Sequence, residues 1–221
     1  MTKTALNTYN KQFAAVLTGD IVNSQGLSDS EFSSVIQLLK TEFVQYASKY
    51  DGHFDIFRGD AFQFVTNHAH FIMNILVGLR LALKAHSPSV DIRVSAAVGD
   101  VSYRNTEVKT GTGQAFVLSG RALDELKSQH IAFTCSSPSL MRSTSLLTQF
   151  ADNHLSGLTQ TQSETVLAYL MSEEKNHDTV AVLLGKNRSN VTRILNASRY
   201  KLIADYLHFM EQEINASVQE M

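Results

Sequence analysis

Apolar residues follow two different spacings along the first two thirds of the chain, and each spacing predicts one kind of element. Three short apolar runs are typical of buried strands, at 13–17, 90–98 and 131–135. Apolar residues recur three or four positions apart in four other stretches and predict helices, at 28–50, at 69–85, at 113–127 and after Pro138. Alternating residues on both sides of Arg58, Gly59 and Asp60 predict a hairpin over 53–66.

The order of these elements predicts an α+β domain. Strand, helix, hairpin, helix, strand, helix and strand follow one another, which is typical of a ferredoxin-like sheet with helices covering one face. The residues between 98 and Thr112 are polar, and no strand is predicted there. The polar segment 151–158 is expected to be a linker, and the chain from Thr159 onward is expected to be helical. The predicted domains are therefore 1–150 and 151–221.

The second predicted domain contains the spacing of a helix-turn-helix. Ala181 is small enough for two helices to pack closely, and Gly185, four residues later, suits a turn with positive φ. Val191 and Ile194 then fall where the second helix must pack back onto the first. This Ala-x3-Gly-x5-Val-x2-Ile pattern predicts an all-α helix-turn-helix domain.

The polar residues of this segment favour double-stranded DNA as the partner. They are of the types that contact base edges and phosphates: Lys186, Arg188, Ser189, Asn190, Thr192, Arg193, Asn196 and Arg199. Five Lys or Arg residues and no Asp or Glu lie between Thr179 and Ala204. The alternative is a plain helical hairpin that binds a partner protein.

Composition and charge exclude some classes of protein and leave the prediction of a DNA-binding domain unchanged. The formal net charge is −2, so any DNA-binding surface must be local. The single cysteine, Cys135, excludes an intrachain disulfide and fits a reducing compartment. No run reaches the roughly 18 apolar residues of a membrane span, and the polar N-terminus lacks a signal-peptide core. We expect a cytoplasmic protein without a membrane partner.

Two aspartates at predicted strand and hairpin ends suggest a metal site. Asp20 follows the first strand, and Asp60 lies in the hairpin turn. If these strands are neighbours, the two carboxylates and the carbonyl of Ile21 suit Mg²⁺ together with nucleotide phosphates. The alternative is a pair of loop aspartates that cap turns.

Three segments resemble class III nucleotide cyclases. AAVLTGDIVN (14–23) resembles their first strand, whose Asp-Ile pair binds metal, and RGDAFQ (58–63) resembles their hairpin and that of GGDEF domains. GQAFVLSGRAL (113–123) resembles the helix that presents an Asn and an Arg to the phosphates. With the appended helix-turn-helix, the whole chain is similar to SatD-family proteins.

The resemblance implies a nucleotide-cyclase-type domain that binds Mg²⁺ or Mn²⁺ with a nucleotide. Asp20, Ile21 and Asp60 would hold the metal, and Arg121 would face the phosphates. Arg58 either contacts an anion or caps the hairpin. Class III cyclases act as dimers and helix-turn-helix proteins usually bind as dimers, so a homodimer is expected.

Three positions depart from the cyclase pattern. The family's asparagine falls at Val117, its base-recognising lysine falls at Ile56, and the second acidic residue of GGDEF falls at Ala61. Loss of one transition-state donor typically costs on the order of a hundred-fold in rate. The pattern therefore favours a transcriptional regulator whose first domain senses a nucleotide or dimerises. The alternatives are an active metal-dependent nucleotidyl cyclase or related phosphoryl-transfer enzyme, and a pure interaction protein.

Overall fold

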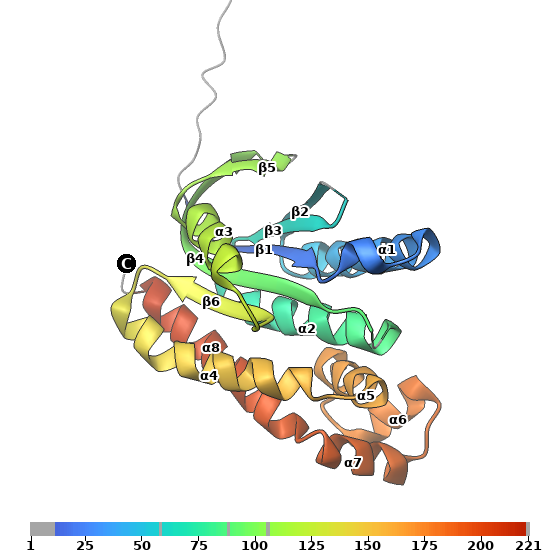
Figure 1. The fold of residues 1–221 in the computed structure, drawn as a ribbon. Coiled ribbons are helices and arrows are strands. Elements are labelled where there is room, and N and C mark those ends of the chain that lie inside the picture. The colour runs from blue at the N-terminus through green and yellow to red at the C-terminus, as the bar shows by residue number, and fades with distance from the viewer. Residues whose placement is uncertain (1–11, 58, 88, 105–106, 220–221) are drawn as a thin grey trace, which may run out of the picture.

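The computed structural model describes residues 12–57, 59–87, 89–104 and 107–219 (Figure 1). The elements in chain order are β1 (Gln12–Ile21), the short 3-10 helix η1 (Ser24–Gly26), α1 (Asp29–Lys49), β2 (Gly52–Phe57), β3 (Ala61–Thr66), η2 (Ala69–Phe71), α2 (Ile72–His86), β4 (Ile92–Arg104), β5 (Glu107–Thr112), α3 (Gln114–Glu125), β6 (Ile131–Cys135), α4 (Pro138–Ser156), α5 (Gln160–Met171), α6 (His177–Leu184), α7 (Arg188–Ala197) and α8 (Tyr200–Gln219).

The sheet has the strand order β2-β3-β1-β4-β5, and β6 also pairs with β4. β1 is antiparallel to both of its neighbours, β3 and β4. The first half of β4 pairs with β6 in parallel, and its last residues pair with β5. Apart from the two short 3-10 helices, the chain begins β1-α1-β2-β3-α2-β4, the βαββαβ order of ferredoxin-like folds, so the α+β prediction for this part is confirmed.

β5 is the strand that the sequence pattern missed. In this six-residue strand, Val108 is buried and the other side chains are exposed or half-buried. A strand with one buried side chain has no clear alternation of apolar and polar residues. Its position therefore depends on pairing with β4, which no local pattern reports.

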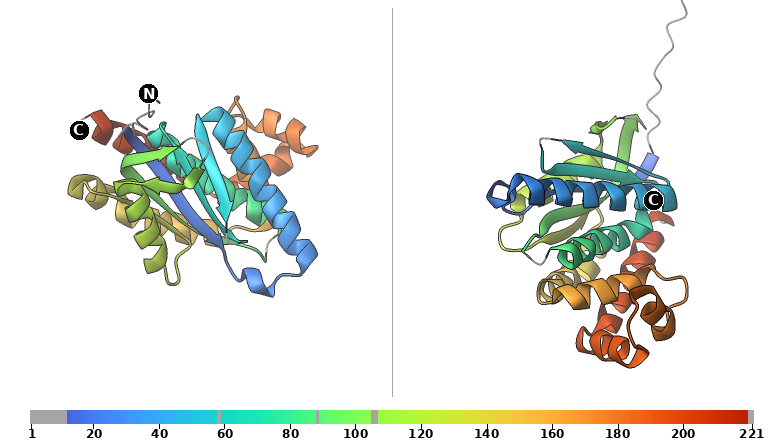
Figure 2. Two further views of the ribbon diagram at one scale, coloured as in Figure 1. Left: turned by 90° about the horizontal axis from the view of Figure 1, so that it is seen from above. Right: turned by 90° about the vertical axis from the view of Figure 1, so that its right-hand side faces the viewer.

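Helices cover both faces of the sheet, which corrects the expectation that they cover one. Along β1, Ala15 and Leu17 belong to the main core under α1 and α2. Ala14 and Val16 point to the opposite face and pack with Phe116 of α3 in a second, smaller cluster. Because successive side chains of β1 point to opposite faces of the sheet, this strand contributes to two cores. α3 covers part of the second face (Figure 2).

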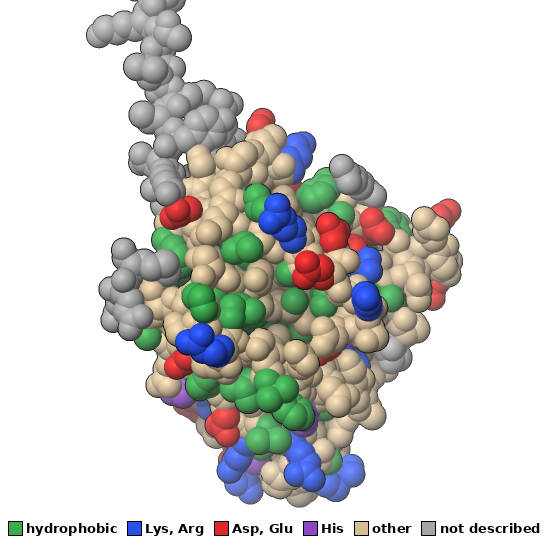
Figure 3. Space-filling model, turned by 60° about the vertical axis from the view of Figure 1, so that its left-hand side comes forward, with side chains coloured by type: hydrophobic (Ala, Val, Ile, Leu, Met, Phe, Trp, Pro, Cys, Tyr) green, Lys and Arg blue, Asp and Glu red, His purple; other side chains and the backbone are tan. Residues whose placement is uncertain are grey.

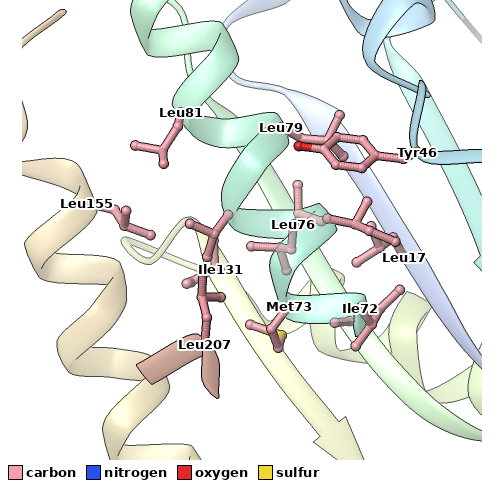
Figure 4. Close-up of a cluster of buried hydrophobic side chains, with 14 of the residues drawn as sticks. Leu17, Tyr46, Ile72, Met73, Leu76, Leu79, Leu81, Ile131, Leu155 and Leu207 are labelled. Carbon is pink, nitrogen blue, oxygen red and sulfur yellow. The ribbon is translucent and has the colours of Figure 1, made fainter. Parts of the chain in front are cut away.

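α2 is the centre of the main core. Twelve of its fifteen residues are buried, as expected of a helix that is covered all round. Figure 4 shows Leu17 of β1 on one side of this helix, and Ile131 of β6, Leu155 of α4 and Leu207 of α8 on the other. The C-terminal helices therefore cover α2, and the sheet, α2 and these helices form three successive layers (Figures 1 and 2).

The prediction of a linker at 151–158 is wrong, because α4 continues to Ser156. The side chain of Asp152 is 7% exposed and forms an ion pair with the fully buried Arg80 of α2, with 2.5 Å between Oδ1 and Nη1. Arg80 also holds Asp91 at 2.9 Å. The polar residues that suggested a linker thus attach α4 to the first part of the chain.

α6 and α7 form the helix pair that the spacing predicted. α6 ends at Leu184, and the three residues of the turn precede the start of α7 at Arg188. Gly185 has φ of 59° and ψ of 33°, the left-handed conformation that glycine adopts at little cost. Val180, Ala181, Val191 and Leu195 are buried in the main core cluster. Within the described part of the chain, no helix has the length and apolarity needed to cross a bilayer.

Candidate functional site

The end of β1 places Asp20 at the edge of the sheet. Gly19 precedes it, and a Cβ at Gly19 would lie 2.5 Å from the ring of Phe62 and 2.7 Å from the carbonyl oxygen of Arg93. A side chain at this position would therefore push β1 away from both neighbouring strands. Asp20 itself lies opposite Ala61 of β3 and Arg93 of β4, so the residue after Asp60 is its direct neighbour.

Arg93 holds both carboxylate oxygens of Asp20. Its Nε lies 3.0 Å from Oδ1 and its Nη2 lies 2.7 Å from Oδ2, a bidentate pair. Hydrogen bonding to Asp20 raises the pKa of Arg93 above its usual value, so this cation stays charged. Arg93 was not predicted as a site residue, because it lies 73 positions away in the sequence and reaches Asp20 only through strand pairing.

Asp60 lies in the turn between β2 and β3, beside the loop that follows β1. Its Oδ2 accepts a hydrogen bond of 2.5 Å from the Ser24 hydroxyl. A cleft of about 380 Å³ opens beside it, lined by Ser24, Gln25, Leu27, Asp29, Phe32, Gly59 and Asp60. Both predicted aspartates therefore lie at the same end of the sheet, and Asp60 lines the cleft.

A row of polar side chains continues from Asp20 across the same sheet face. Thr18 Oγ1 lies 2.8 Å from Ser119 Oγ of α3, and Gln63 Nε2 lies 3.4 Å from Thr18 Oγ1. Ser95, opposite Thr18 on β4, is fully buried, and its hydroxyl has no partner among the described residues. The alternation of Thr18 and Asp20 with the apolar residues of β1 is the sequence signal that could have found this row.

The positions taken from the cyclase resemblance lie in different surroundings. Arg121 is exposed on α3, and Val117, one turn earlier, is 50% exposed. Ile56 packs against the main core, on the face of the sheet that α1 and α2 cover, and does not contribute to the polar row. Arg58 lies outside the described residues.

The donor set at this edge fits a divalent cation only in part. The two carboxylates are the ligand type that Mg²⁺ prefers, and Ile21, whose side chain is buried, offers only its main-chain carbonyl. No group of three or more His, Cys, Asp or Glu suited to a metal occurs in the described ranges. A cation here would take its remaining ligands from water or from a phosphate group, because Mg²⁺ commonly binds through one or two carboxylates plus phosphates.

The second candidate region is the outer face of α7. Of the eight predicted DNA contacts, Arg188, Ser189, Arg193, Asn196 and Arg199 are exposed, and the other three are half-buried. Arg188 pairs with Asp178 at 2.9 Å, with side chains 65% and 69% exposed, and Lys186 pairs with Glu164 at 2.5 Å. Acidic residues from outside the basic segment thus neutralise two of its cations. Among the described residues, Arg193 and Arg199 have no carboxylate partner.

Thr192 faces inward instead of outward. Its Oγ1 lies 2.8 Å from His177 Nδ1, and His177 Nε2 lies 3.1 Å from the Tyr200 hydroxyl. This chain links the start of α6, the middle of α7 and the start of α8. His177 and Tyr200 were not predicted as functional residues, and their role here is to fix α7 against its neighbours.

Solved structures with a similar fold are nucleotide cyclases. The guanylyl cyclase Cya2 is 18% identical with a TM-score of 0.45, over 59% of this chain and 78% of that chain. The adenylyl cyclase CyaB from P. aeruginosa is also 18% identical with a TM-score of 0.45, over 61% and 82%. The non-canonical dimeric guanylyl cyclase domain of the RhoGC fusion protein from the aquatic fungus Blastocladiella emersonii is 18% identical with a TM-score of 0.48, over 60% of this chain and 84% of that chain.

No protein-family model and no curated protein matches this chain. These three structures cover 59–61% of this chain at 18% identity, so their activities say nothing about the activity of this protein. Membership of the SatD family stays a prediction.

Proposed function

We propose that this chain is a DNA-binding regulator in which α7 contacts the major groove, and in which the Asp20–Asp60 edge binds a nucleotide together with a divalent cation. The observation that supports DNA binding most directly is the division of α7 into two faces. Val191, Ile194 and Leu195 are buried against the neighbouring helices, and the opposite side exposes the polar residues named above. A second helix after a short glycine turn, with such a face, is the arrangement that reads a major groove.

Electrostatics support the same role. Arg193 and Arg199 have no carboxylate partner among the described residues, so they can pair with phosphates or base edges. Arg193 Nη2 donates a hydrogen bond to Asn190 Oδ1 at 2.9 Å, which orients both side chains on this face. The Arg188–Asp178 pair is exposed and contributes at most about 1 kcal/mol, so a phosphate can replace Asp178 at little cost. Thr192 is excluded from this set of contacts by its hydrogen bond to His177, and we assign it a positioning role.

The test is binding to a pool of fragments from the genome that encodes the protein, at physiological salt. The wild type should retain a few fragments selectively. Replacing Arg188 and Arg193 together by Ala should weaken binding to those fragments at least 10-fold, since each good base or phosphate contact contributes about 1–3 kcal/mol. Arg142→Ala is the matched control, because Arg142 is exposed on α4 and should leave affinity unchanged. Unchanged binding in the double variant would refute the role assigned to α7.

A second candidate function is metal-dependent nucleotidyl transfer at the sheet edge, and the cleft beside Asp60 favours it. A bound cation would there polarise phosphate oxygens, and Asp20 and Asp60 would hold it. Arg93 would have to release the oxygens of Asp20 to the cation, and it would then neutralise charge beside the phosphates. Purified protein with Mn²⁺ and each nucleoside triphosphate should then release pyrophosphate, and Asp60→Asn should abolish the release. If the protein binds a nucleotide but releases no pyrophosphate, the enzyme hypothesis is excluded and the nucleotide-sensing hypothesis remains.

A further inference from the structure

α4 and α8 line an apolar groove. Its volume is about 490 Å³. Its walls are Leu147, Phe150, Ala151, His154 and Leu155 from α4, and Leu202, Ile203, Asp205, Tyr206 and Phe209 from α8. Asp205 is the single Asp, Glu, Lys or Arg in this wall. Few charges and several aromatic rings are the composition of the core of a protein–protein interface.

The groove is fixed by hydrogen bonds between the two helices. The Thr148 hydroxyl lies 3.0 Å from the Tyr206 hydroxyl, and the Ser143 hydroxyl donates to Glu213 Oε2 at 2.7 Å. At the other end of α4, His154 Nε2 lies 2.8 Å from the carbonyl oxygen of Ser198, just before α8. Because both helices are held in place, a partner meets a preformed surface and loses little free energy in ordering it.

Apolar side chains also project outward from the rim of this groove. Eight large hydrophobic side chains are exposed among the described residues, and four of them lie here: Leu146 at 60%, Leu147 at 41%, Phe150 at 64% and Leu202 at 57%. Together they expose roughly 400 Å² of apolar surface, which is as large as the main apolar patch of a typical monomer. Figure 3 shows apolar side chains gathered on the lower half of this face, above the basic side chains at the bottom.

We propose that a second copy of this chain docks on the α4–α8 groove and forms a two-fold dimer. A small ligand inside the groove would leave Leu146 uncovered, because this exposed side chain is not part of the groove wall. A second copy covers it, since the same surface has both an exposed Phe150 and a groove to receive the Phe150 of the partner. Such self-complementarity is the requirement of a two-fold interface.

The exposed area and the charges are consistent with this occupant. A stable interface buries about 800 Å² on each partner, and the four rim side chains supply roughly half of it. Lys201 and Asp205 are exposed on α8, one turn apart, in a stripe beside Leu202. A two-fold axis near Leu202 places Lys201 of each copy opposite Asp205 of the other. This proposal does not depend on DNA or nucleotide binding.

The dimer is tested by sedimentation equilibrium of the full chain at micromolar concentrations. The wild type should have twice the mass of the chain. Phe150→Glu with Leu202→Glu should weaken the dimer on the order of 100-fold or more, because each change places an unpaired charge in the apolar interface. Val44→Glu is the matched control, since Val44 is 59% exposed on α1, away from the groove, and should leave the mass unchanged.

Exchanging the charges of Lys201 and Asp205 tests the two-fold arrangement and leaves the apolar residues in place. Lys201→Glu alone and Asp205→Lys alone should each weaken the dimer, and the two changes together should restore it. Circular dichroism identifies a variant that has failed to fold.

A wild type that stays monomeric, or a dimer that survives the Phe150 and Leu202 changes, would overturn the proposal. A monomer that binds anilinonaphthalene sulfonate only while Phe150 is present would instead assign the groove to a small apolar ligand.

Discussion

Replacing Asp152 by Ala tests whether α4 is joined to the first part of the chain through buried charges. Asp152 Oδ1 lies 2.5 Å from Nη1 of Arg80, a side chain with no exposed surface. Its Oδ2 accepts a hydrogen bond of 3.0 Å from the main-chain N–H of His130. The substitution therefore removes a charge-assisted hydrogen bond and leaves a main-chain donor without its partner.

The magnitude follows from these two contacts. A hydrogen bond between charged groups contributes about 1.5–3 kcal/mol, and a buried donor left unpaired costs about 1–3 kcal/mol. Arg80 keeps its two hydrogen bonds to Asp91, at 3.0 and 2.9 Å, so its charge is not left without a counterion. We therefore expect Asp152→Ala to lower the free energy of unfolding by about 3 kcal/mol. Asp152→Asn, which keeps the shape and one acceptor, should cost about half as much.

Urea unfolding followed by circular dichroism measures both variants, because the chain has no Trp for fluorescence. Asn153→Ala is the control, since Asn153 is exposed on the same helix and should change stability by less than about 0.5 kcal/mol. If Asp152→Ala has as small an effect as the control, the buried ion pair does not stabilise the fold and the argument fails.

Three further predictions concern other parts of the molecule. Gly185→Ala should cost about 1–2 kcal/mol in urea unfolding, because φ is 59° and a Cβ would meet no atom within 4 Å, so the penalty is purely conformational; an unchanged midpoint would contradict this. Arg93→Ala should tighten Mn²⁺ binding measured by electron paramagnetic resonance without nucleotide, since it releases both oxygens of Asp20; unchanged affinity would exclude Asp20 as a ligand. Burial raises the pKa of Cys135, so less thiolate is present at pH 8, and iodoacetamide should modify the folded protein more slowly than the urea-unfolded chain in mass spectrometry; equal rates would refute it.

Local sequence patterns determined most of the elements of this protein. The helix expected at 28–50 is α1, and it begins with a capping box in which Ser28 and Glu31 each bond the other's main-chain N–H. The pair α6 and α7 follows from the positions of Ala181, Gly185 and Val191. These features depend on residues a few positions apart, so their periodicity and capping report them directly.

The tertiary structure decided what each element contacts. Arg93 takes both oxygens of Asp20 across 73 positions, Asp152 reaches Arg80 across 72, and a single core cluster runs from β1 to α8. The polar residues at 151–158 have the same local signature whether they are exposed in a linker or buried in a helix. The spacing of apolar and polar residues determines which face of a helix or strand is buried. The free energy of long-range contacts determines which other element packs against that face. Those contacts exist only once the chain has folded.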